Sequence, residues 1–114
     1  MSMFNVAIIN GDGYSEILTA AAKRVLTAVS EKFDFSLNFH PVDARAFLGK
    51  SESEILKTDE YKVVKSADAA IAGAITYDFA RSSVHDDVIT LICKNLGLFG
   101  CFRSIKSFYN TINC

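Results

Sequence analysis

The sequence has little of several features that define whole classes of protein. Among its 114 residues it has no tryptophan, a single proline at position 41, and no apolar run longer than residues 69–75. A membrane-spanning helix needs about 20 apolar residues, so no membrane span is expected. The first residues show no basic stretch followed by an apolar one, so no secretory signal is expected either. The expected location is therefore the cytoplasm.

An excess of one charge is also absent. Twelve basic and 13 acidic residues give a net charge of −1, so neither nucleic acid nor an anionic membrane is an expected partner. Cysteines are few, and Cys93, Cys101 and Cys114 form no Cys-x-x-Cys motif. We interpret them as free thiols of a reducing compartment rather than as metal ligands or disulfides.

What is present is a regular alternation of strand-like and helix-like blocks. Half of the residues are hydrophobic and nine are Phe, enough for a packed core. The predicted strands are residues 4–9, 35–42, 69–75 and 98–105, and the predicted helices are residues 15–32, 54–66 (one or two pieces) and 84–96. This order predicts an α/β fold in three layers, a largely parallel sheet flanked by helices, in a single domain over residues 1–114.

Local patterns add finer expectations for these elements. Either Asp12 or Ser15 is expected to cap helix 15–32, and residues 43–53 are expected to form a loop. Strand 35–42 alternates between apolar and polar residues, so one of its faces should be dry. Strand 69–75 is apolar on both faces, as expected at the centre of a parallel sheet. The stripe expected to pack helix 15–32 onto the sheet is Leu18, Ala21, Ala22, Val25, Val29 and Phe33.

Three blocks in order resemble the β-decarboxylating dehydrogenases, the family of isocitrate and 3-isopropylmalate dehydrogenases. Residues 6–13, Val-Ala-Ile-Ile-Asn-Gly-Asp-Gly, resemble the family's first strand and its Pro-Gly-Asp-Gly turn. Residues 66–74 resemble its Glu-Ala-Asp-Ala-Val-Leu-Leu-Gly-Ala strand, and residues 96–106 resemble its Leu-Gly-Leu-Tyr/Phe-Ala-Asn-Leu-Arg-Pro-Val-Lys segment. The resemblance covers nearly the whole chain and implies the N-terminal part of that fold.

The resemblance also implies an anion site, because the family clamps its substrate carboxylates with arginines. One family arginine corresponds to Arg103 here, whereas the other corresponds to Cys93 and is lost. Asp86 and Asp87 fall where a di- or tri-anionic substrate would dock. Arg103, Asp86 and Asp87 are therefore the candidate substrate-binding residues. The alternative readings are a structural arginine at a strand end, and two acids favoured by the positive end of a helix.

Other family features are altered or missing. Tyr14 and Ser15 replace the family's Ile and Gly in the first turn, and Glu16 breaks the Gly-x-Gly-x-x-Gly fingerprint of dinucleotide sites. The catalytic Tyr and Lys and the metal-binding aspartates of the family lie downstream of the matched blocks. We therefore expect no catalytic residues and no cofactor in this chain; NAD(P) and Mg²⁺ would be needed only with a complementary fragment. His40 and His85 lack partners at metal-ligand spacing, so no metal site is expected.

These observations leave three functional hypotheses. The first is a truncated, non-catalytic relative that acts through protein–protein contact, as a homo-oligomer, regulator or inhibitor, because an uncovered apolar sheet face would need a cover. The second is the N-terminal fragment of a split or truncated NAD(P)-dependent dehydrogenase. The third is a repurposed small-ligand binder or enzyme that uses Asp86, Asp87 and Arg103.

Overall fold

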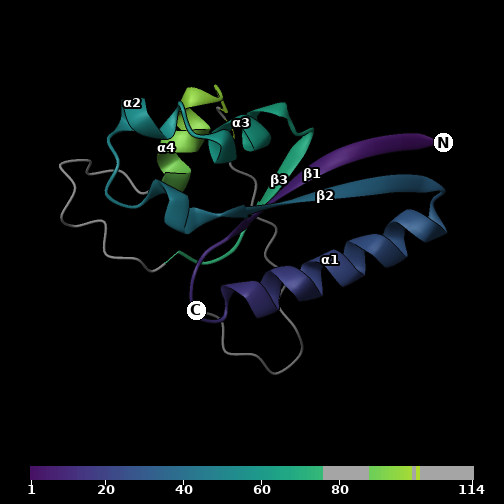
Figure 1. Cartoon of the computed structure of the whole chain (residues 1–114). Coiled ribbons are helices and arrows are strands. Elements are labelled where there is room, and N and C mark those ends of the chain that lie inside the picture. The colour runs from purple at the N-terminus through teal and green to yellow at the C-terminus, as the bar shows by residue number, and fades with distance from the viewer. Residues whose placement is uncertain (76–87, 99, 101–114) are drawn as a thin grey trace.

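Three parallel strands with helices on both sides form the framework of the protein (Figure 1). The computed structural model describes residues 1–75, 88–98 and 100. The strands lie in the order β2-β1-β3, with β1 in the middle. Along the chain the elements are β1 (Ser2–Asn10), α1 (Ser15–Lys32), β2 (Phe35–Asp43), η1 (Ala44–Phe47), α2 (Glu52–Ile55), α3 (Asp59–Ser66), β3 (Ala69–Ala72) and α4 (Val88–Asn95). The predicted α/β class and parallel sheet are thus confirmed.

The central strand β1 is covered on both faces at its carboxyl half. Its four consecutive residues from Val6 to Ile9 are all buried, as expected of a strand with helices above and below it. Val6 pairs with Phe39 of β2 and with Ala69 of β3. Figure 1 shows α1 on one side of the sheet and α2, α3 and α4 on the other.

The helix α1 has the predicted bounds, but its start differs from the prediction. Tyr14 occupies the N-cap position, and no side chain makes a capping hydrogen bond there. The expected cap by Asp12 or Ser15 is therefore wrong. The Ser15 hydroxyl instead accepts a hydrogen bond from the Gly11 N–H, at 2.9 Å, which ties the helix back to the preceding turn.

The side of α1 that packs on the sheet also differs from the predicted stripe. The buried residues of α1 are Ser15, Thr19 and Ser30, whereas Leu18 and Val25 are 60% and 63% exposed. The reason is close approach. A Cβ on Gly73 would meet the Ser15 and Thr19 side chains, so only small residues fit where α1 crosses the end of β3. The packing stripe predicted from hydrophobic periodicity consists mainly of larger apolar residues, which lie on a neighbouring side of the helix.

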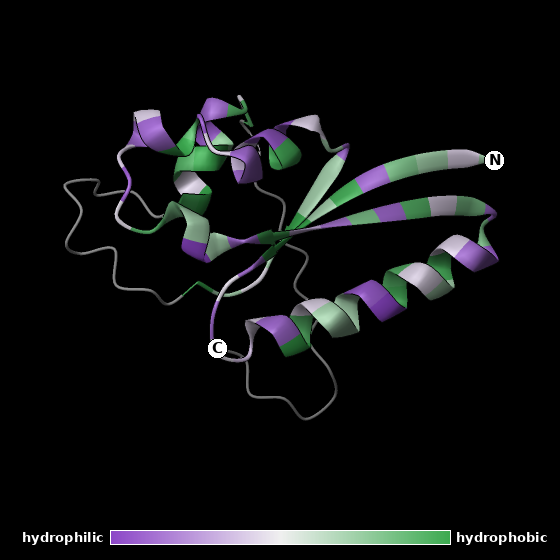
Figure 2. Ribbon diagram, viewed as in Figure 1, coloured by the Kyte–Doolittle hydropathy of each residue, from purple (hydrophilic) through white to green (hydrophobic). Residues whose placement is uncertain are grey.

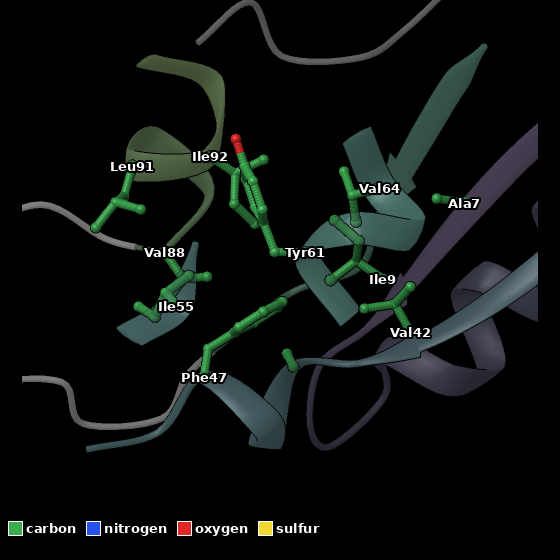
Figure 3. Packing of buried hydrophobic residues seen from close by; sticks show 11 residues of the cluster. Ala7, Ile9, Val42, Phe47, Ile55, Tyr61, Val64, Val88, Leu91 and Ile92 are labelled. Carbon is green, nitrogen blue, oxygen red and sulfur yellow. The ribbon is translucent and has the colours of Figure 1, made fainter. Parts of the chain in front are cut away.

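The main core lies on the opposite side of the sheet (Figure 3). The fully buried Phe47 belongs to this core. Residues of β1 and β2 and of the three short helices α2, α3 and α4 complete it. Segment 43–53 is not the predicted loop: η1 and the first residues of α2 lie in it, with Asp43 capping η1 and a Ser51–Glu54 capping box starting α2. The buried cluster comprises Ala7, Ile9, Val42, Ala44, Phe47, Ile55, Tyr61, Val64, Val88, Leu91 and Ile92.

Strand β3 is shorter and more exposed than predicted. It ends at Ala72, and Ala69, Ala70 and Ala72 are exposed, so the expected burial on both faces is wrong. Within the described sheet, β3 is an edge strand with β1 as its neighbour. The helix expected at residues 84–96 is confirmed from Val88 onwards and ends before Gly97, whose φ is 69°. Most of the strand expected at residues 98–105 lies outside the described residues.

No helix in the described part of the chain is both long and apolar enough to cross a membrane.

Candidate functional site

An open cleft of about 470 Å³ lies at the carboxyl ends of β1 and β2. Loops after the carboxyl ends of parallel strands are where α/β folds place their ligand sites. The turn between β1 and α1 forms one wall, and the end of β2 with η1 forms the other. The cleft is lined by Asn10, Gly11, Asp12, Gly13, Glu16, Pro41, Val42, Asp43 and Arg45.

The first three residues of the turn from Asn10 to Gly13 make close contacts with neighbouring segments. A Cβ on Gly11 would overlap the Ala74 carbonyl, so only glycine allows this approach. The Asp12 N–H donates to the same Ala74 carbonyl at 3.2 Å. The Thr19 hydroxyl donates to the Asn10 side-chain carbonyl at 2.8 Å. These contacts connect the turn after β1 to α1 and to the chain after β3.

The opposite wall carries an ion pair. The Arg45 Nε lies 3.0 and 2.9 Å from the two carboxylate oxygens of Asp43, and its Nη2 lies 2.6 Å from Oδ2. The Arg45 backbone N–H also donates to Asp43 Oδ1, at 2.9 Å. These hydrogen bonds from Arg45 lower the pKa of Asp43, so Asp43 is ionised at neutral pH.

The described residues that line the cleft carry charges of both signs. Asp12, Glu16 and Asp43 contribute three carboxylates, whereas Arg45 contributes one guanidinium that is already engaged by Asp43. The N–H groups of Gly11 and Asp12, which a phosphate at this turn could use, donate to Ser15 and Ala74 instead. The described residues contain no group of three or more His, Cys, Asp or Glu residues able to hold a metal ion. The N–H groups of Gly11 and Asp12 are thus engaged within the chain.

The candidate residues taken from the sequence lie elsewhere. Arg103, Asp86 and Asp87 fall outside the described residues, so their arrangement stays a prediction. Cys93 is half-buried on α4, beside the buried Ile92. His40 lies on the polar face of β2, with its Nε2 3.0 Å from the Asn5 side-chain oxygen.

Two residues of the cleft were missed in the sequence. The sequence pattern places Asp43 and Arg45 in a loop without a role, whereas in the structure they line the wall opposite the glycine turn. Their position directly after a predicted parallel strand was a usable signal, because the carboxyl ends of β1 and β2 must meet at one edge of the sheet. Nothing in the local pattern indicated that the two side chains pair with each other.

Comparison with known proteins agrees with this arrangement of strand, glycine turn and helix. The sequence model of the isocitrate/isopropylmalate dehydrogenase family matches residues 5–114. The chain belongs to this family. It is 33% identical to the 3-isopropylmalate dehydrogenase of Clostridium pasteurianum over 116 aligned residues, which cover 98% of this chain and 32% of that enzyme.

Two other relatives match this chain with similar identity and coverage. The 3-isopropylmalate dehydrogenase of Bacteroides fragilis is 26% identical, with 92% of this chain and 31% of the relative covered. The isocitrate/homoisocitrate dehydrogenase of Pyrococcus horikoshii is 28% identical, with 93% and 29% covered. This isocitrate/isopropylmalate dehydrogenase family member therefore spans about a third of the length of the curated relatives it matches.

Proposed function

We propose that this member of the dehydrogenase family acts through protein–protein contact rather than by catalysis within the single chain. The observation that carries the proposal is the exposed apolar surface on the α1 side of the sheet. Ile17, Leu18 and Val25 of α1 are each at least 60% exposed. Contiguous exposed apolar surface of this kind marks an interaction site in soluble proteins.

The sheet beside α1 adds to this surface. A groove of about 530 Å³ is lined mainly by apolar side chains of the three strands and by Leu26 of α1. Phe4, at one end of it, is 44% exposed and makes an edge-on contact with Phe35, with ring centroids 6.1 Å apart. Figure 2 shows hydrophobic segments recurring along α1 as well as along the strands above it. Burial of this surface would contribute roughly 25 cal/mol per Å² to association.

One altered family position also supports the proposal. Cys93 occupies the position at which the family resemblance implies a substrate arginine, and a thiol cannot form the bidentate pair with a carboxylate that a guanidinium forms.

Size-exclusion chromatography with light scattering, together with fluorescence of an apolar dye, tests the proposal. We expect either a concentration-dependent oligomer, or a monomer whose dye binding is abolished when a partner is added. A monomer that binds no dye at any concentration would contradict the proposal, because the apolar surface would then be covered within the chain.

A second candidate function is favoured by the family match. The chain corresponds to about a third of enzymes named 3-isopropylmalate dehydrogenase, so it could act as the N-terminal part of an NAD(P)-dependent dehydrogenase assembled from two chains. Mg²⁺ and the nucleotide would then be held by the complementary chain. Co-expression with the remaining two thirds of the Clostridium pasteurianum enzyme tests this: NAD reduction with 3-isopropylmalate would support it, and a soluble complex without activity would favour contact alone.

A small-ligand site built from Asp86, Asp87 and Arg103 is the third candidate and stays a prediction. A thermal-shift screen with nucleotides and small carboxylates tests it. An increase in Tm that is lost in Arg103→Gln would support the site, and the absence of any shift would remove it.

A further inference from the structure

Asn10 is followed directly by Gly11, at the point where β1 passes into the glycine turn. Asparagine is among the thermolabile residues, and a glycine after it places no side chain in the way of its side-chain amide. None of the other five asparagines of the sequence precedes a glycine. The family motif that residues 6–13 resemble has proline at this position, so the Asn-Gly pair is a departure from that motif.

The reaction open to such a pair is deamidation through a cyclic imide. The backbone nitrogen of Gly11 attacks the side-chain carbon Cγ of Asn10, a carbon–nitrogen bond forms, and the side-chain nitrogen leaves as ammonia with the Gly11 N–H proton. Water then adds to one of the two imide carbonyls and breaks its bond to the nitrogen. Hydrolysis at Cγ leaves an ordinary aspartate, whereas hydrolysis at the backbone carbonyl leaves an isoaspartate, in which the main chain continues through the side chain.

The folded structure opposes ring closure in three ways. Asn10 is the last residue of β1 and stands opposite Asp43 of β2. Its backbone is therefore extended, with ψ about +115° in a parallel strand, and ring closure must rotate the Gly11 nitrogen from this direction toward the side chain. The Thr19 hydroxyl donates to the Asn10 side-chain oxygen at 2.8 Å. The Gly11 N–H donates to the Ser15 hydroxyl at 2.9 Å.

We propose that Asn10 is a site of spontaneous deamidation, which the hydroxyls of Thr19 and Ser15 keep unreactive in the folded chain and which local opening of the turn makes reactive. Ser15 and Thr19 are only 0% and 4% exposed, so both hydrogen bonds form where water competes little for them. Asn10 also lines the open cleft, so the water that hydrolyses the imide reaches it. The geometry of the turn, and not the supply of water, limits the reaction.

The isoaspartyl product does not fit the folded turn. It adds one main-chain carbon directly before Gly11. A Cβ on Gly11 would already overlap the Ala74 carbonyl, and the Asp12 N–H donates to that same carbonyl. The longer chain therefore has no room to keep both contacts. An opening of the turn that lasts long enough for ring closure thus leaves a permanently less stable chain.

Peptide mapping by tandem mass spectrometry measures deamidation at residue 10. The full chain is incubated in mildly alkaline buffer, with and without urea. We expect the folded wild type to react at least about tenfold more slowly than the unfolded chain, because only the locally opened fraction reacts. Equal rates in the two conditions would overturn the proposal.

Two threonines of α1 give a matched pair of variants. Thr19→Val removes the hydroxyl that binds Asn10 and keeps the methyl carbon beside Gly73, whereas Thr27→Val removes an exposed hydroxyl that donates to the Lys23 carbonyl. In the folded state Thr19→Val should deamidate about two- to tenfold faster than wild type, the factor that corresponds to one hydrogen bond. Thr27→Val should react at the wild-type rate. Equal rates in the two variants would overturn the proposal.

Two further variants separate local opening from global unfolding. Ser15→Ala removes the acceptor of the Gly11 N–H and should also react faster than wild type. Ile92→Val loosens the core on the other side of the sheet and should leave the rate unchanged, although urea unfolding shows it to be less stable. A rate that follows the loss of global stability equally in all these variants would overturn the proposal, because the two hydroxyls would then have no local effect.

The aged wild type tests the consequence for the turn. Its isoaspartyl fraction, separated by ion-exchange chromatography, should unfold at a lower urea concentration than the unmodified fraction. Asn10→Asp is the control, because it equals the ordinary product and retains an oxygen for the Thr19 hydroxyl. An isoaspartyl fraction as stable as Asn10→Asp would overturn the claim that the longer chain disrupts the turn.

Discussion

Gly73 lies directly against Ser15, at the point where the chain leaves β3 and crosses the first turn of α1. A Cβ on Gly73 would overlap the Ser15 hydroxyl oxygen and would lie 3.1 Å from the Thr19 methyl carbon. The same hydroxyl accepts a hydrogen bond from the Gly11 N–H. The glycine turn, the helix and the end of β3 are therefore fixed to one another through the Ser15 side chain.

The first prediction follows from this contact. Gly73→Ala should destabilise the protein by about 1–3 kcal/mol, because an added methyl group in a filled space forces the backbone apart. Urea unfolding followed by circular dichroism measures the change. Gly100→Ala is the matched control, since a Cβ there meets no atom within 4 Å. Equal stability of the two variants would show that the contact with Ser15 is not tight.

A second prediction concerns the coupling between these residues. Ser15→Ala alone should cost about 1–2 kcal/mol, because the Gly11 N–H loses its acceptor in a partly buried place. In the Gly73→Ala background the same change should cost less or even stabilise, because it removes the overlapping oxygen. A double-mutant cycle in urea measures the coupling. Additive effects would show that the methyl group and the hydroxyl do not compete for the same space.

A third prediction uses two adjacent residues of the core. Phe47 is fully buried, whereas Leu48 is 39% exposed. Phe47→Ala should cost about 3–5 kcal/mol, because it removes a large, fully buried side chain from the packed cluster. Leu48→Ala should cost under about 1 kcal/mol, in keeping with a side chain that loses little buried surface. Both values come from chemical unfolding, and a similar loss in both variants would place the core elsewhere.

The sequence predicted the order and type of the elements well where periodicity and turn residues agree. The bounds of α1 match, because a long amphipathic run is followed by a turn in which Asp34 has a φ of 56°. The predicted packing side of α1 was wrong, because hydrophobic periodicity ranks positions by their hydrophobicity and not by the size of their side chains. Where the helix approaches Gly73, small side chains such as Ser15 and Thr19 are the ones that fit.

The candidate site was harder to predict than the fold. The glycine turn was located, since Gly11 and Gly13 follow a strand directly. The pairing of Asp43 with Arg45 depends on how η1 turns after β2, and a strand pattern does not specify this. Arg103, Asp86 and Asp87 came from family resemblance alone, and they stay predictions because they lie outside the described residues.

The last prediction concerns pH and the Asp43–Arg45 pair. Hydrogen bonds from Arg45 lower the pKa of Asp43 below its ordinary value, so the pair contributes stability above the pKa of the unfolded state, and this contribution is lost as the pH falls through the lower folded pKa. The side chains of Arg45 and Asp43 are 69% and 48% exposed, so water screens the pair and Arg45→Gln should cost under about 1 kcal/mol at neutral pH. The difference from wild type should shrink below about pH 4, where Asp43 is protonated in the unfolded state. Urea unfolding across this pH range and a carboxyl-carbon NMR titration of Asp43 test this prediction.

Lys65→Gln, at an exposed lysine on α3, is the control and should show no such pH dependence. An Asp43 pKa that is unchanged in Arg45→Gln would show that the pair does not persist in solution.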